Sequence, residues 1–244
     1  KGKLTFTGAF PLLSQIGKAA FAGASNAESV IELVDGLAPK LATIENHAFE
    51  SFNGKLTFTG AFPLLTQIGV SAFYRAGSAD SAVELVDELA PKLAMLEENA
   101  FQYFKGKLTF TGSFPLLSRI GVSAFESRGA DDDAGYDNRY YNGYDNNAGT
   151  VESAIELVDG LAPKLASIEN YAFYSFKGTL TFTGSYPLLI RIGIGAFKSA
   201  GTADSTIELV DGFAPKVATI EDETFQFFKG RLTFTGAFPL LARI

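Results

Sequence analysis

The chain repeats itself, and the repeat limits the folds that it can adopt. The string KLTFTG begins at Lys3, Lys55 and Lys107, and it recurs as TLTFTG at Thr179 and as RLTFTG at Arg231. The leucines of these strings are 52, 52, 72 and 52 residues apart, so the third interval is one period with 20 added residues. A fixed period of this kind is typical of stacked repeat arrays. We therefore expect one continuous solenoid.

Each 52-residue period contains two related units. The first reads LTFTGAFPLLSQIGKAAF from Leu4 to Phe21, and the second reads IELVDGLAPKLATIENHAF from Ile31 to Phe49. The units are 27 and 25 residues long, which lies within the range of leucine-rich repeats. Residues 1–244 hold five units of the first kind and four of the second. Because Lys1 and Ile244 both fall inside the pattern, we expect the chain to be a segment of a longer array.

The pattern inside a unit predicts its local structure. Leu4 and Phe6 alternate with polar residues, which favours a short strand with one buried face. A glycine and a proline then turn the chain. Ala20–Phe21 and Ala48–Phe49 are expected in short helical turns on the other side, and the 23 phenylalanines are expected to form a repeated core ladder. The predicted fold class is an α/β repeat solenoid, with a parallel sheet on one face and helical turns on the other.

A second motif carries a resemblance to a known family. The pattern L-x-x-I-G-x-x-A-F occurs at Leu13–Phe21, Leu65–Phe73, Leu117–Phe125 and Leu189–Phe197, and a variant with Glu after Ile or Leu occurs at Leu41–Phe49, Leu93–Phe101 and Leu165–Phe173. These motifs resemble the BspA-type leucine-rich repeat, although the cysteine that usually follows Ala-Phe is absent. The resemblance implies a curved solenoid used for adhesion or protein binding, often on the surfaces of bacteria and protists. It implies no catalytic residues.

Composition and charge exclude several classes of partner. The net charge is −7, and no basic stripe is visible in the linear sequence, so nucleic acid and anionic membrane surfaces are not expected partners. Hydrophobic runs are interrupted by Gly, Pro or charged residues, so we expect no membrane insertion. The chain has no cysteine, which excludes disulfides and thiolate metal sites.

The outward positions of the predicted sheet are the first candidate binding surface, because solenoids usually bind through such faces. One expected row alternates threonine with glutamate, and a second alternates threonine with valine. The candidate residues are Thr5, Thr7, Glu32, Thr57, Thr59, Glu84, Thr109, Thr111, Glu156, Thr181, Thr183 and Glu208. Threonine also suits any strand, so a purely structural role remains an alternative. Ice binding is a further alternative, but glutamate on alternate strands opposes it.

The sequence favours a non-catalytic protein. The glutamates of the row are expected about 10 Å apart in identical surroundings, and coupled acid–base chemistry needs closer carboxylates in different environments. His47 is the only histidine, and Asn99, Tyr171 and Glu223 occupy its place in other units. This variation suits an exposed structural position.

The 20 added residues form the second candidate surface. Residues 129–149 read GADDDAGYDNRYYNGYDNNAG, a composition unlike the rest of the chain. Tyr supplies contact area and Asn and Asp supply hydrogen bonds in recognition loops, whereas a plain polar loop is the alternative. The candidate residues are Asp131, Asp132, Asp133, Tyr136, Asp137, Asn138, Tyr140, Tyr141, Tyr144, Asp145 and Asn146. Calcium is a further alternative, with Asp131, Asp133, Asp137 and Asp145 as ligands, although the spacing matches no EF-hand loop.

These observations predict a binding scaffold for a protein or a glycan, at a cell surface or outside the cell, without a cofactor. The alternative is a structural subunit of an extracellular coat, matrix or filament, which would self-associate.

Overall fold

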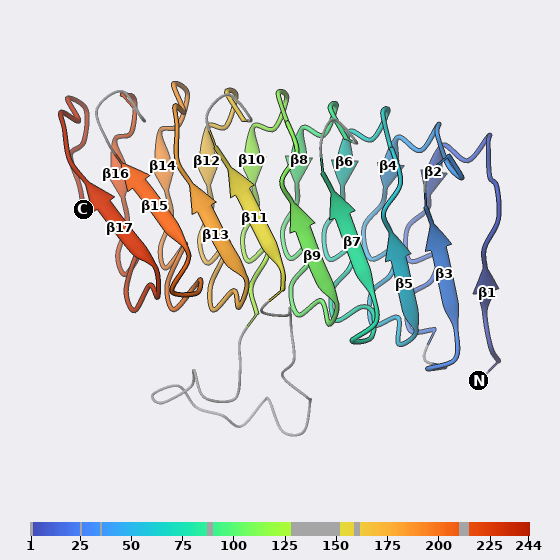
Figure 1. Cartoon of the computed structure of the whole chain (residues 1–244). Helices are drawn as coiled ribbons and strands as arrows, with labels where there is room; N and C mark the ends of the chain where they lie inside the picture. Colours follow the sequence, from blue (N-terminus) through green and yellow to red (C-terminus); the bar gives the residue numbers. More distant parts are fainter. Residues whose placement is uncertain are drawn as a thin grey trace.

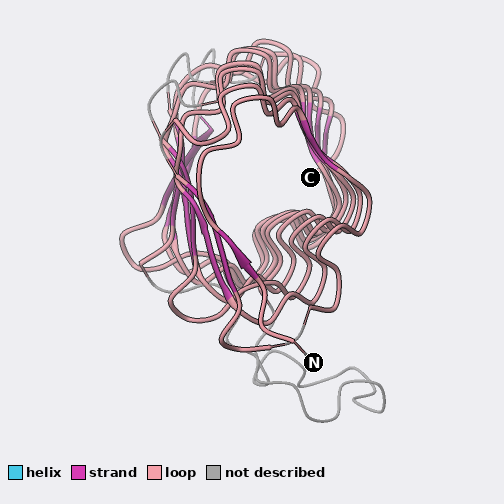
Figure 2. Cartoon of the chain, turned by 90° about the vertical axis from the view of Figure 1, so that its right-hand side faces the viewer, coloured by secondary structure: helices cyan, strands magenta, loops and turns pink. Residues whose placement is uncertain are grey.

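A computed structural model of the chain describes residues 2–24, 26–34, 36–86, 90–127, 152–158, 162–209 and 215–244. The described residues form a parallel β-solenoid in which each unit makes one rung (Figure 1). Viewed along the stacking axis, successive rungs overlie one another around a three-sided outline (Figure 2).

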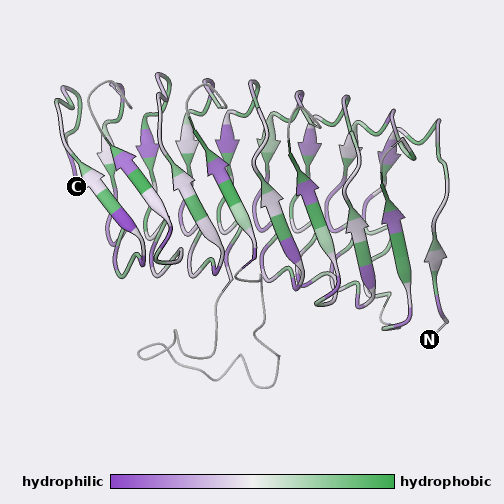
Figure 3. Cartoon of the chain, viewed as in Figure 1, coloured by the Kyte–Doolittle hydropathy of each residue, from purple (hydrophilic) through white to green (hydrophobic). Residues whose placement is uncertain are grey.

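The first side is the main sheet, in which nine described strands pair in parallel in chain order. The strands are β1 (Thr5–Phe6), β3 (Val30–Leu33), β5 (Lys55–Phe58), β7 (Ala82–Leu85), β9 (Lys107–Phe110), β11 (Ala154–Leu157), β13 (Thr179–Phe182), β15 (Thr206–Leu209) and β17 (Arg231–Phe234). Hydrophobic and hydrophilic segments follow one another along the strands (Figure 3). In the strands from β3 to β15 the second and fourth residues are apolar and buried, whereas the first and third are at least partly exposed. The short parallel strands expected from the sequence are confirmed, and nine described strands stack in this sheet.

The second side is a sheet of two-residue strands, again parallel and stacked in chain order. They are β2 (Gln15–Ile16), β4 (Thr43–Ile44), β6 (Gln67–Ile68), β8 (Met95–Leu96), β10 (Arg119–Ile120), β12 (Ser167–Ile168), β14 (Arg191–Ile192) and β16 (Thr219–Ile220). In each strand the second residue points inward and is buried, whereas the first faces outward.

The third side is a ladder of β-turns, and the expected helical turns at Ala20–Phe21 and Ala48–Phe49 are not found there. Among the described residues no segment is helical. His47, Phe49 and Ser51 donate their backbone N–H groups to carbonyls of the next rung, with N–O distances of 2.7–2.8 Å. The residues between them donate instead to the carbonyl three residues earlier. Every second N–H therefore points along the axis of the solenoid. In an α-helix these groups would instead point along the axis of the helix itself.

A left-handed backbone conformation makes this alternation geometrically feasible. His47 and Ser51 have φ values of 61° and 55°, and the corresponding residues of the other rungs share the positive sign, apart from Ser127. Such a conformation costs roughly 1–2 kcal/mol for a residue other than glycine. It is compensated by the inter-rung hydrogen bonds, so these strained residues are explained by stacking and not by a catalytic role.

Phenylalanine fills the interior, as the sequence predicts. One ring per rung stacks on the next at centroid distances of 4.9–5.7 Å, in the order Phe21, Phe49, Phe73, Phe101, Phe125, Phe173, Phe197 and Phe225. The six inner rings from Phe49 to Phe197 are at most 1 % exposed. Buried aromatic pairs stabilise beyond the area that they bury, so the ladder holds the rungs in register.

The two kinds of unit fit each other. The buried hydroxyl of Ser81 accepts hydrogen bonds from the N–H of Leu56 and of Ser78, both at 2.9 Å. The following rung places Gly106 against the same serine, where any side chain would collide with the Ser81 carbonyl. Ser29, Ser153 and Ser205 have the same role. This complementarity explains why two unit types alternate.

The inserted segment leaves the stack intact. Strands β9 and β11, on either side of it, pair directly, as do β10 and β12. Phe125 also donates its N–H to the carbonyl of Ala172 at 2.7 Å. The rungs before and after residues 129–149 are therefore ordinary neighbours.

Candidate functional site: the outer face of the main sheet

The outer face of the main sheet brings glutamate and threonine together in pairs. Four glutamates lie directly opposite four threonines of the following strand: Glu32 opposite Thr57, Glu84 opposite Thr109, Glu156 opposite Thr181 and Glu208 opposite Thr233. We call these the Glu–Thr pairs. The pairs recur every second rung, about 10 Å apart, so the face presents one small site four times.

The expected straight row of alternating Thr and Glu is wrong. On its other side Thr57 is opposite Ala82, not Glu84, and Thr5 is opposite Val30, not Glu32. The register shifts by two residues at each step from the first kind of unit to the second. Sequence spacing alone hides this shift, because it aligns equivalent residues and not hydrogen-bonded ones. The row is a series of separate pairs, which also removes the regular threonine lattice that ice binding would need.

The second candidate row lies just beyond the strands. Thr59, Thr111 and Thr183 donate their N–H groups to carbonyls of the preceding strand, at 3.1–3.2 Å. This bonding extends the main sheet by one residue and leaves the threonine side chains partly exposed. Thr7 is exposed in the first rung. The structure thus places every candidate residue of the sheet face on one surface.

Cations accompany three of the four Glu–Thr pairs. Lys55 lies 4.0 Å from Glu32, Lys107 lies 3.7 Å from Glu84, and Arg231 lies 3.5 Å from Glu208. The glutamate side chains expose 34–37 % of their surface. Such long, exposed ion pairs are weak, so these carboxylates keep much of their capacity to accept hydrogen bonds from a ligand.

Two threonines of the face hold unused hydrogen-bonding groups. The hydroxyl oxygens of Thr57 and Thr109 are buried and have no hydrogen-bond partner among the described residues. A buried hydroxyl without a partner costs roughly 1–3 kcal/mol. Both lie in Glu–Thr pairs.

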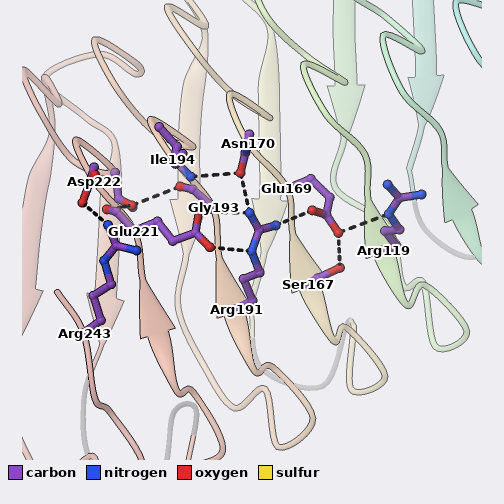
Figure 4. A network of polar contacts seen from close by, with 11 residues as sticks. Arg119, Ser167, Glu169, Asn170, Arg191, Gly193, Ile194, Glu221, Asp222 and Arg243 are labelled. Carbon is purple, nitrogen blue, oxygen red and sulfur yellow. Dashed lines mark hydrogen bonds and ion pairs between the residues drawn. The ribbon is translucent and has the colours of Figure 1, made fainter.

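The carboxylates of the second sheet behave differently. Glu45, Glu97, Glu169 and Glu221 alternate along this sheet with Gln15, Gln67, Arg119, Arg191 and Arg243. Gln67 bonds to Glu97 at 2.9 Å, and Arg119 lies between Glu97 and Glu169 at 3.5 and 3.2 Å. The side chains of Glu97, Glu169 and Glu221 are 17–19 % exposed. We call this row the carboxylate ladder, and Figure 4 shows its part from Arg119 to Arg243. Sequence reasoning missed it, although a repeat alignment shows its alternation.

Arg191 is the best-connected cation of the ladder. Its guanidinium donates to both carboxylate oxygens of Glu221, to Glu169 and to the side-chain oxygen of Asn170 (Figure 4). The hydrogen bond to Glu221 is the main cause that raises the pKa of Arg191 above its ordinary value, although burial opposes it. The same bond lowers the pKa of Glu221 against the effect of burial. These carboxylates are already saturated, so the ladder joins rungs and offers little to a ligand.

The third side carries His47 and an aromatic cluster. The Nδ1 atom of His47 lies 2.7 Å from Glu50, and its side chain is 37 % exposed, which agrees with the expected surface position. The guanidinium of Arg75 lies 5.1 and 5.6 Å from the ring centroids of Tyr74 and Tyr103. Cation–π contacts of this kind hold neighbouring rungs together.

A small apolar cavity of about 10 Å³ lies in the described interior, close to the space of one water molecule. Its lining is Leu93, Leu96, Phe110, Phe114, Leu117, Ile120, Phe125, Ile155 and Leu157. Nearby, the rings of Phe110 and Phe114 are 6.2 Å apart, whereas Phe58 and Phe62 stack at 4.1 Å. A cavity so small and apolar cannot hold a polar substrate.

The remaining candidates concern metals, membranes and the insertion. In the part of the chain that the structure describes, no group of three or more His, Asp or Glu residues could hold a metal ion. No described helix is long and apolar enough to cross a membrane. The recognition residues predicted in 129–149, and the calcium ligands proposed among them, lie outside the described residues.

Comparisons with known proteins identified no relative of this chain. No family model, no curated protein and no solved structure matches this chain. The fold is therefore described by its own geometry, as a parallel β-solenoid built from two alternating units.

Proposed function

We propose that this chain is a non-catalytic binding scaffold that recognises an extended protein or glycan through the Glu–Thr pairs of the main sheet. The observation that carries the proposal is the contrast between the two sheets. Carboxylates of the ladder have partners at 2.7–3.2 Å and are mostly covered. Those of the main sheet have cations no closer than 3.5 Å and are about one-third exposed. The free hydrogen-bonding capacity thus lies on the main sheet.

The repetition of the pairs suggests the kind of ligand. Four equal sites about 10 Å apart bind best to a ligand that itself repeats, because each added contact is then intramolecular. An extended glycan is the simplest such ligand, since its hydroxyl groups donate hydrogen bonds to the partly exposed carboxylates. Two extensions of this proposal rest only on the L-x-x-I-G-x-x-A-F motifs. The first is that the chain acts in adhesion at a cell surface or outside the cell. The second is that it is related to leucine-rich repeat proteins.

The test is a binding screen against surface glycans and matrix proteins. The quadruple variant E32Q/E84Q/E156Q/E208Q removes the four carboxylates and keeps their shape. The matched control E50Q/E98Q/D222N/E223Q makes the same charge change on the third side. Binding that the first variant loses and the control retains supports the proposal. Equal binding by both variants contradicts it.

A structural subunit of a coat, matrix or filament is the second candidate. Every side of the solenoid repeats with the same two-rung period, so two copies lying side by side would match along their whole length. Light scattering over a concentration series tests this candidate. Growth of the particles with concentration favours it, and a monomer at all concentrations opposes it.

A further inference from the structure

One exposed position recurs at the corner between the two sheets, directly after a proline in every rung. This position is leucine in units of the first kind and lysine in units of the second, giving Leu12, Lys40, Leu64, Lys92, Leu116, Lys164, Leu188, Lys216 and Leu240. All nine side chains are exposed. We call them the Leu–Lys edge. Neither the main-sheet face nor the carboxylate ladder includes any of them.

The exposure of these leucines is a property of the corner and not of the outermost rungs. Leu64, Leu116 and Leu188 lie in interior rungs and are 37, 38 and 40 % exposed. The next residue in each case is also leucine and is at most 2 % exposed. A turn hydrogen bond, such as that from the N–H of Leu65 to the carbonyl of Phe62 at 2.9 Å, fixes this division. The fold therefore holds one leucine inward and presents its neighbour to the outside.

The stacking of the rungs makes the edge a continuous line. Because neighbouring strands are about 4.8 Å apart, leucine and lysine alternate from one rung to the next along this corner, whose turns form the upper border of the solenoid in Figure 1. Ile190, 50 % exposed, adds apolar surface beside Leu188. Single exposed leucines need no explanation, whereas this position is leucine in every unit of the first kind and lysine in every unit of the second.

The charged side chains that the structure describes in the corner segments are all lysines, although the chain as a whole is acidic. The described corner segments 10–14, 38–42, 62–66, 90–94, 114–118, 162–166, 186–190, 215–218 and 238–242 contain no acidic residue. Much of the net charge of −7 comes from residues 129–149, with five aspartates and one arginine. An aspartate precedes each edge lysine by five residues, at 35, 87, 159 and 211, and lies outside the described residues.

We propose that the Leu–Lys edge docks on the surface of an anionic lipid bilayer. The leucine side chains enter the interface between head groups and acyl chains, while the lysine ammonium groups bind lipid phosphates. Exposed apolar residues interleaved with lysines are the chemistry of segments that lie on membranes. A bilayer also covers a line of this kind without a matching groove. The linear sequence hid the lysines, since they are 52 and 72 residues apart.

The test is co-sedimentation of the full chain with lipid vesicles. One set contains phosphatidylcholine alone, and the other contains phosphatidylcholine mixed with phosphatidylglycerol. The wild-type chain should bind the anionic vesicles, and binding should weaken with salt. The variant K40Q/K92Q/K164Q/K216Q should bind at least tenfold more weakly, because each lysine near such a surface contributes about fivefold. The control K3Q/K18Q/K105Q/K229Q should remain close to wild type.

The apolar half of the edge is tested separately. The variant L64S/L116S/L188S should also lose binding, and its circular dichroism should keep the wild-type strand signal because the buried neighbours Leu65, Leu117 and Leu189 still fill the core. Equal binding to both vesicle types, equal loss in the control, or no vesicle binding would overturn the proposal. Concentration-dependent scattering that this variant abolishes, without vesicle binding, would assign the edge to a second copy instead.

Discussion

Arg191 and Glu221 form a two-point ion pair between neighbouring rungs, with Nε 2.7 Å from Oε1 and Nη2 3.0 Å from Oε2. The same guanidinium also reaches Glu169 in the preceding rung. One side chain therefore joins three rungs. Because units of the first kind supply the arginines of the ladder and units of the second kind supply its glutamates, the ladder depends on the alternation of units.

Replacing Arg191 tests how much the ladder stabilises the stack. R191M should lower the free energy of unfolding by about 2 kcal/mol, because it leaves two partly buried carboxylates without their donor. R191Q should cost less, since glutamine already bonds to glutamate at the Gln67–Glu97 step. Urea unfolding of both variants provides the measurement. Equal losses would show that charge and not hydrogen bonding decides the contribution.

The same pair predicts a pH dependence. The pKa of Glu221 is lowered in the folded chain, chiefly by its hydrogen bond from Arg191. The folded chain therefore stabilises the ionised carboxylate more than the unfolded chain does. Its contribution is present above the unfolded pKa of the carboxyl group and is lost as pH falls through the folded value. The raised pKa of Arg191 affects the stability of the chain only in strong alkali. Between neutral pH and about pH 3 the free energy of unfolding should therefore fall more steeply for the wild type than for E221Q. It is measured by denaturant unfolding at a series of pH values. Parallel curves would contradict this assignment.

Replacing Gly69 tests how tightly the two kinds of unit pack against each other. A Cβ at Gly69 would lie 2.6 Å from the side-chain oxygen and 2.7 Å from the backbone nitrogen of Asn46. G69A should therefore cost about 1–3 kcal/mol through overpacking. Gly17 holds the same position in the first rung, with nothing within 4 Å, so G17A is the matched control. Thermal unfolding should separate the two variants, and equal midpoints would show that the rungs adjust freely.

The buried serines provide an independent test of stacking. S81A leaves the N–H of Leu56 buried without its acceptor, which should cost about 1–3 kcal/mol. S78A removes a half-buried hydroxyl whose only side-chain contact, to Ser81, is long at 3.4 Å, and it should be nearly neutral. Denaturant unfolding compares them. A neutral S81A would mean that water replaces the serine hydroxyl.

Deleting residues 129–149 should leave the solenoid intact, because the rungs on either side already pair through β9 and β11 and through β10 and β12. Circular dichroism and the unfolding midpoint should stay close to those of the full chain. Loss of folding would show that the insertion supports the stack. The sequence also predicts weaker ligand binding, and unchanged affinity would remove the recognition role of the insertion.

The sequence was sufficient to predict stacked rungs, because Leu and Phe alternate at fixed intervals and can be buried only by neighbouring copies. It failed at the third side, where Ala48–Phe49 suggested a helix. Propensity does not reveal that His47 and Ser51 adopt left-handed conformations to bond across rungs. The two-residue register shift that separates Thr57 from Glu84 likewise depends on strand pairing.

The measurement that tests the central claim most directly is affinity as a function of ligand length, using oligosaccharides of one glycan found in the screen. The account predicts that affinity rises with length until the ligand spans the four Glu–Thr pairs, about 30 Å. E156Q/E208Q should then lower the plateau to that of a shorter ligand. Affinity that is independent of length, or unchanged in this variant, would contradict recognition by repeated sites on the main sheet.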